Sequence, residues 1–180
     1  MMKKFAWQTA SISLILFICA CPTAAQSRAD AEKAIRRSAY ETTKAFLSAN
    51  VRVFKQNVTE RSISVFRSTF DLFRQDAKYR DDLQRAGVSS FDQFLEYIML
   101  GMSPRLAGPL APAKAAEKIS NESQMSFINN AEAKILFNNS EFARALLSRG
   151  QWKIDLTQTI KRILLEEVGD PQMKAKIKNF

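Results

Sequence analysis

The sequence predicts an α+β protein in which N-terminal helices pack on a curved antiparallel sheet. Two observations carry this prediction. Residues 26–86 contain no glycine and no proline, and their apolar residues recur at helical spacing. Residues 131–156 fall into three short segments separated by two turn-forming clusters, Asn138-Asn139-Ser140 and Arg149-Gly150, a pattern typical of a meander of antiparallel strands.

The first 25 residues have the features of a secretory signal. Lys3 and Lys4 precede an apolar core without charge, and Ala25 ends a stretch of small residues of the kind that signal peptidase recognises. The apolar run is shorter than the ~20 residues of a bilayer-spanning helix. We therefore expect residues 1–25 to be removed, leaving a periplasmic or secreted protein with a single domain at residues 26–180. Processing as a lipoprotein acylated at Cys21 is the alternative.

The chain carries a formal net charge of +9, and its basic residues are scattered except in a basic C-terminal tail at Lys174, Lys176 and Lys178. Scattered charge is typical of a solvated surface, and export argues against a nucleic-acid partner. A peripheral contact of the tail with an anionic membrane is left open. No cysteine follows Cys21, so the exported domain depends on its core without a disulfide.

The helical region is expected to begin with one long helix starting near Asp30. Its stripe of core positions steps by four and three residues. The stripe consists of Ile35, Ala39, Thr42, Phe46, Ala49 and Val53.

A second helix is expected after a cap at Thr59 or Ser62, with a stripe that runs from Phe66 through Phe70 and Phe73 to Ala77 and an end at Gly87. The pair Ser90 and Gln93 predicts a capping box that opens a third helix. Gly101 or the Ser103-Pro104 pair is expected to end this helix. Pro104, Gly108, Pro109 and Pro112 then indicate an extended connection.

The start of the strand region has only a weak sequence pattern. Residues 113–119 fit a connection, a helical turn or a strand, whereas residues 124–128 look extended. Trp152 and Ile154 alternate with Lys153 and Asp155, which predicts a strand with one buried face. Residues 157–168 fit a short helix or a strand extension. The segment Glu141–Ser148 also fits a helix capped by Ser140, and in that case an all-α domain replaces the α+β prediction.

These features resemble the NTF2-like (cystatin-like, cone-shaped) superfamily. The resemblance lies in the long N-terminal helices, in the helix opened by Ser90-Phe91-Asp92-Gln93, and in the strand Gly150-Gln151-Trp152-Lys153-Ile154. It implies a curved sheet wrapped around the helices. The superfamily contains isomerases, dehydratases, ligand-binding proteins and scaffolds, so the resemblance implies a fold more than a function.

Catalytic chemistry has few candidate residues in this chain. There is no histidine, which removes the commonest general base and zinc ligand, and we expect no metal, no cofactor and no catalytic residue. A carboxylate base is the one alternative, at Asp155, Asp92 or Glu96. Asp155 is expected on a solvated face, because it alternates with Trp152 and Ile154.

The aromatic and methionine residues predict either an ordinary core or an apolar pocket between helices and sheet. The candidate ligand-binding residues are Phe94, Tyr97, Met99, Phe127 and Trp152. Three functional interpretations follow. The first is an exported, non-enzymatic binding or assembly module of the bacterial envelope, with an envelope protein as partner and a homodimer left open. The second is a carrier or sensor of a small apolar ligand, and the third is a carboxylate-dependent isomerase.

Overall fold

The computed structural model describes residues 27–180, so the predicted export signal and Cys21 lie outside the described residues. Eight helices and four strands make up the described part. In chain order they are α1 (Arg28–Leu47), α2 (Val51–Asn57), α3 (Glu60–Gln75), α4 (Ala77–Arg85), α5 (Phe91–Ala107), α6 (Pro112–Glu122), β1 (Gln124–Asn129), β2 (Glu132–Phe137), β3 (Ser140–Ser148), β4 (Gln151–Asp155), α7 (Thr157–Glu167) and α8 (Pro171–Lys178). The predicted α+β class is confirmed.

The four strands form one antiparallel meander in the order β1-β2-β3-β4. Both predicted turns have the backbone that tight hairpins require. Asn138 and Asn139 have φ of 50° and 60°, and Arg149 and Gly150 have φ of 51° and 77°. Because β3 pairs with a strand on each side, residues 141–148 are a strand, and the all-α alternative is wrong.

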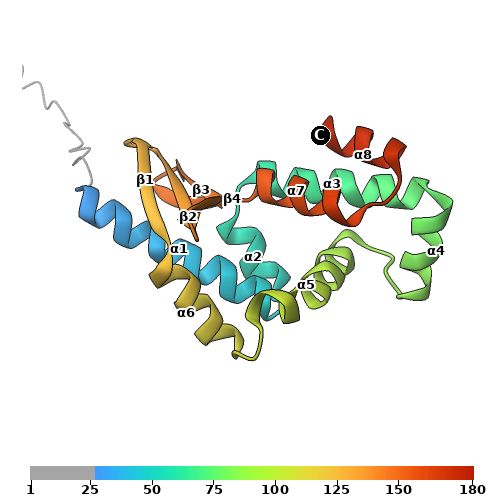
Figure 1. The fold of residues 1–180 in the computed structure, drawn as a ribbon, viewed down its shortest axis with the longest axis horizontal. Coiled ribbons are helices and arrows are strands. Elements are labelled where there is room, and N and C mark those ends of the chain that lie inside the picture. The colour runs from blue at the N-terminus through green and yellow to red at the C-terminus, as the bar shows by residue number, and fades with distance from the viewer. Residues whose placement is uncertain (1–26) are drawn as a thin grey trace, which may run out of the picture.

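Helix α1 packs on one face of the sheet, and the other helices extend well beyond the sheet. The face toward α1 is closed by buried side chains from β2, β3 and β4, namely Ala133, Ile135, Ala143, Ala145, Trp152 and Ile154. Ser38 of α1 donates to the backbone oxygen of Trp152 at 2.8 Å. The sheet, α1 and α6 lie at one end of the molecule and α3, α4, α7 and α8 at the other, with α2 and α5 between them (Figure 1).

The expected long first helix is wrong, because it is divided between α1 and α2. Ala49 has φ of 51°, the amide of Asn50 donates to the oxygen of Ala45 at 2.8 Å, and the amide of Ala49 donates to the oxygen of Phe46 at 3.1 Å. This is the Schellman pattern, in which the left-handed residue is usually glycine. The Asn50 side chain then caps α2 by accepting from the amide of Val53 at 3.1 Å. An alanine at the left-handed position concealed the break.

The other predicted helix ends are partly confirmed. Thr59 caps α3, and Gly87, with φ of 70°, follows α4, but Asp76 interrupts the expected second helix and caps α4. The capping box at Ser90 is present. The expected end near Pro104 is wrong, since α5 continues through the proline to Ala107.

The basic tail is a helix rather than a loose terminus. Met173 and Ile177 of α8 are buried, and α8 packs on α7, while Lys176 and Lys178 remain exposed. Within residues 27–180, none of the helices combines the length and apolar character that a membrane crossing requires.

Candidate functional site

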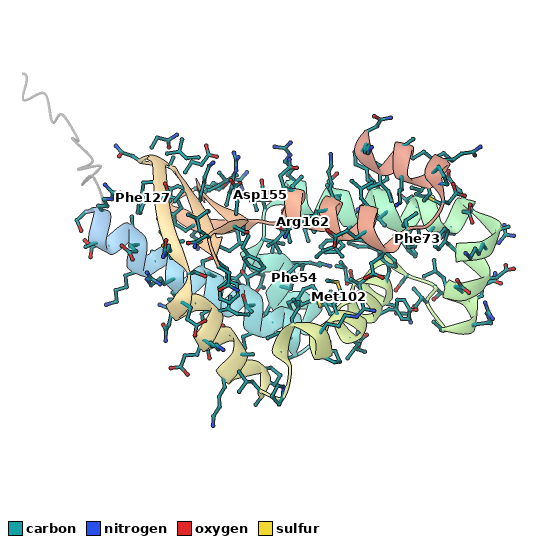
Figure 2. The ribbon with its side chains drawn as sticks, in the orientation of Figure 1. Phe54, Phe73, Met102, Phe127, Asp155 and Arg162 are labelled. Carbon is teal, nitrogen blue, oxygen red and sulfur yellow. The ribbon has the colours of Figure 1, made fainter. Side chains whose placement is uncertain are left out.

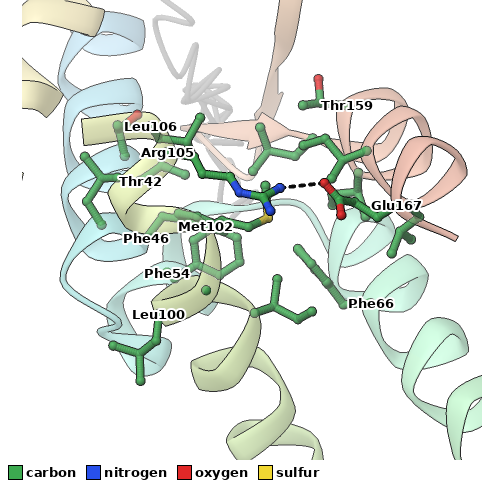
Figure 3. Close-up of a pocket in the computed structure, with 18 of the residues that line it drawn as sticks. Thr42, Phe46, Phe54, Phe66, Leu100, Met102, Arg105, Leu106, Thr159 and Glu167 are labelled. Atoms are coloured by element: carbon green, nitrogen blue, oxygen red, sulfur yellow. Dashed lines mark hydrogen bonds and ion pairs between the residues drawn. The ribbon is translucent and has the colours of Figure 1, made fainter. Parts of the chain in front are cut away.

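A pocket of about 660 Å³ lies where α1, α3, α5 and α7 meet the inner face of the sheet. Its volume falls within the ~300–1,000 Å³ typical of small-molecule sites. Figure 3 shows side chains converging on it from several elements that are distant in the sequence, with α5 on one side and α7 on the other. The pocket is therefore a product of the tertiary fold and not of one motif.

The wall is mostly carbon, and aromatic rings hold its shape. The ring of Phe54 in α2 meets Phe46 of α1 at a centroid distance of 5.6 Å and Phe66 of α3 at 6.1 Å, both edge to face. Phe73 and Phe94 meet at 6.0 Å in the same manner. Edge-to-face pairs are favoured by the ring quadrupoles, so these contacts fix the positions of α1, α2, α3 and α5 around the pocket.

Two of the five predicted ligand-binding residues line this pocket, the buried Phe94 and the half-exposed Tyr97. Met99 is fully buried and packs within the core, outside the pocket wall. Phe127 and Trp152 form an edge-to-face pair at 6.5 Å that also lies outside it. Figure 2 shows Phe127 at the sheet end of the molecule, well away from Met102 and Phe73.

One polar side chain in the wall has an unused hydrogen-bonding group. Thr42 of α1 is 3 % exposed, and its hydroxyl has no hydrogen-bond partner among residues 27–180. A buried hydroxyl without a partner is unfavourable.

Charged residues of the pocket occur in two ion pairs. Arg105 Nη1 of α5 donates to Glu167 Oε1 of α7 at 2.6 Å, and Figure 3 shows the arginine extending from α5 toward the glutamate on α7. Asp82 of α4 pairs with Arg85. Arg105 and Glu167 have side chains that are 72 % and 58 % exposed, so this pair borders the solvent.

Exposed apolar side chains of α5 surround the same opening. Tyr97, Leu100 and Leu106 line the pocket and are each at least 45 % exposed. Isolated exposed apolar residues are ordinary, but these three belong to one helix and all contribute to the wall of an apolar pocket.

The carboxylates considered as bases do not face this pocket. Asp92 accepts two bonds from Lys55 Nζ, at 2.9 and 3.0 Å, and Glu96 is exposed. Asp155 lies on the face opposite Ile154, as its alternation predicts, but the expectation that it is solvated is wrong. It is 9 % exposed, because α3 and the start of α7 cover it.

Asp155 belongs to a hydrogen-bonded network that joins three elements. Its Oδ1 accepts from Ser62 Oγ of α3 at 3.2 Å and from the amide of Thr157 at 2.8 Å. Ser62 Oγ also accepts from the amide of Leu156 at 2.8 Å. The network holds the end of β4 and the start of α7 against α3, a structural role.

A second, polar pocket of about 530 Å³ lies beside this network. Arg144 bonds to Glu132 at 3.0 Å and to Glu141 at 2.8 Å, and Lys134 approaches Glu141 at 3.1 Å. The hydrogen bond from Arg144 holds the pKa of Glu141 below its ordinary value, and the bond to Glu141 raises the pKa of Arg144. These charges satisfy one another across the strands.

Tyr79, which lines the apolar pocket, also has a shifted pKa. It stacks on Phe73 at a centroid distance of 4.5 Å. Burial first, and then the charges of Asp76, Asp170 and Asp82, raise its pKa above the ordinary tyrosine value. The phenol therefore stays neutral across the physiological range.

Sequence reasoning missed most of the pocket. Thr42, Phe46 and Phe66 were identified as core positions, and their stripe spacing does not distinguish a filled core from a hollow one. Arg105 and Glu167 are 62 positions apart, and no local pattern pairs them.

Among residues 27–180, no group of three or more acidic, histidine or cysteine side chains is placed to hold a metal ion. Comparisons with protein families, with curated proteins and with solved structures find no match to this chain.

Proposed function

We propose that this protein is a non-catalytic carrier of a small apolar ligand, which binds in the pocket between the helices and the sheet. The observation that carries the proposal is a pocket of about 660 Å³ whose wall is mostly apolar. Transfer of apolar surface from water into such a wall contributes roughly 25 cal/mol per Å² buried. The arrangement favours the carrier over the isomerase interpretation, since Asp155, Asp92 and Glu96 all point elsewhere.

Membership of the NTF2-like superfamily is part of the same proposal. The helix-first order, the antiparallel meander and a pocket between them support it. With an export signal at residues 1–25, the ligand would be carried in the periplasm or outside the cell. An envelope protein that receives or delivers the ligand is the partner this role requires.

Pocket-blocking variants of α5 test the proposal. Gly101 lines the pocket, and a Cβ atom placed there has no heavy atom within 4 Å, so a large side chain can be added at the rim. We expect Gly101→Trp to weaken binding of a polarity-sensitive naphthalene probe by about tenfold or more, since a misfit of one methylene already changes binding on that scale. Glu96→Trp, on the same helix but outside the pocket, is the matched control.

The measurement is probe fluorescence against protein concentration, with circular dichroism melting to verify that both variants fold. Probe binding by the parent and by Glu96→Trp, lost in a folded Gly101→Trp, supports the proposal. Probe binding that is equal in all three proteins, or absent from the parent together with a panel of lipids and hydrophobic metabolites, refutes it.

A further inference from the structure

The basic group at the mouth of the pocket indicates what kind of apolar molecule fits. Arg105 is the only basic residue among those described that line the pocket. Its side chain lines the pocket and is 72 % exposed, so the guanidinium lies at the solvent boundary. A ligand lying in the pocket with one end at the opening would place that end beside Arg105.

Arg105 retains hydrogen-bonding capacity in its ion pair. One nitrogen, Nη1, bonds to Glu167, and no bond from Nε or Nη2 to another residue in the range 27–180 accompanies it. A guanidinium has five N–H donors in a planar fork that matches the oxygens of a carboxylate or phosphate. An incoming anion can therefore use the free donors or take the place of Glu167.

Displacement of Glu167 has a low energetic cost in this position. Its side chain is more than half exposed, so its carboxylate returns to water when it leaves Arg105. The formal net charge of +9, which becomes +7 when Lys3 and Lys4 are removed with residues 1–25, also attracts anions to the protein and repels cations. These two observations favour an anionic head over a cationic head bound by Glu167.

Resting on the proposed function, we propose that the ligand is a single-chain amphiphile with an anionic head, a carboxylate or a phosphate, bound by Arg105 in exchange for Glu167. The hydrocarbon chain occupies the pocket, and the exposed side chains of Tyr97, Leu100 and Leu106 contribute to its wall. In the free protein, Glu167 occupies the place of the head group in an ion pair that joins α5 to α7.

The test compares ligands that share a chain and differ in the head. Palmitate, palmityl alcohol, palmitoyl lysophosphatidic acid and hexadecyltrimethylammonium are titrated, below their micelle concentrations, against the bound naphthalene probe in the full exported chain. We expect at least one of the two anions to bind about tenfold more tightly than the alcohol, as a charge-assisted, bidentate contact provides. The carboxylate and phosphate arms identify which head is preferred.

Two variants of the same ion pair are expected to act in opposite directions. Arg105→Gln removes the head-group contact and should abolish the preference for the anion over the alcohol. Glu167→Gln removes the competing carboxylate and should strengthen anion binding. Arg149→Gln, in the exposed β3–β4 turn, controls for the loss of one positive charge. A purely structural ion pair predicts instead that Arg105→Gln and Glu167→Gln change binding in the same direction.

The outcomes separate this inference from the proposed function. Equal binding of the anions and the alcohol, preference for the ammonium amphiphile, or an anion preference that survives Arg105→Gln overturns the inference while the apolar carrier stands. If neither the probe nor any of the four amphiphiles binds, the proposed function as a carrier is overturned as well. Anion preference that is lost in Arg105→Gln, kept in Arg149→Gln and increased in Glu167→Gln supports both.

Discussion

Substitution of Ser62 by alanine removes one oxygen atom and should lower the free energy of unfolding substantially. Ser62 is fully buried, donates to Asp155 at 3.2 Å and accepts from the amide of Leu156 at 2.8 Å. Alanine leaves the buried Leu156 amide without a partner, which costs roughly 1–3 kcal/mol, and removes a bond to a carboxylate worth roughly 1.5–3 kcal/mol. Since Asp155 keeps the amide of Thr157, we expect a total loss of about 2–4 kcal/mol.

The assay is urea unfolding followed by circular dichroism, with Ser64→Ala as the matched control. Ser64 lies on the same helix but is exposed, so its substitution should change the free energy of unfolding by no more than about 0.5 kcal/mol. If the free energies of unfolding of Ser62→Ala and Ser64→Ala differ by less than that margin, the network does not stabilise the packing of α3 on β4 and α7, and the reasoning is refuted.

Two further substitutions test the polar groups near the pockets. Thr42→Val should raise the free energy of unfolding of the ligand-free protein by about 1 kcal/mol in the same urea assay, because it replaces a buried hydroxyl that has no partner by a methyl group. A lower free energy of unfolding would show instead that the hydroxyl has a hydrogen-bond partner. Glu141→Gln should cost about 0.5 kcal/mol at neutral pH. The folded-state pKa of Glu141 is lowered from 4.5, first by the hydrogen bond from Arg144, so its stabilisation is complete above the unfolded-state pKa and is lost as pH falls through the folded-state pKa. Unfolding of both proteins at pH 7 and near pH 3 checks this, and an equal difference at the two pH values contradicts it.

The strands of this protein were predictable because their signals are local. The turn clusters at Asn138-Asn139 and Arg149-Gly150 require backbone angles that asparagine and glycine adopt readily, and they separate β2, β3 and β4 in the sequence as they do in the structure. Propensity alone divided residues 141–148 evenly between helix and strand. Strand pairing on both edges of β3 decides between the two, as tertiary context often does.

Burial of a charged side chain was the property that the sequence predicted worst. Alternation placed Asp155 on the correct face of β4, but the exposure of that face depends on α3, which is 93 positions away from the aspartate at Ser62. The same applies to the pocket. A stripe of apolar residues predicts which side of a helix faces inward. The volume left between four such helices depends on how they pack in the folded protein.

The helix expectations failed at three places, Ala49, Asp76 and Pro104, and the first and last of them adjoin residues that line the pocket. At Ala49 a non-glycine residue takes the left-handed position, which ends α1 just after Phe46 and lets α2 turn Phe54 into the wall. At Pro104 the helix loses one backbone hydrogen bond and continues, while Ser103 Oγ donates to the oxygen of Met99 at 2.6 Å. The added turn is the one that carries Arg105 to the opening opposite Glu167. Local rules are expected to fail where tertiary packing requires a particular geometry, and at Ala49 and Pro104 that geometry positions Phe54 and Arg105 in the pocket wall.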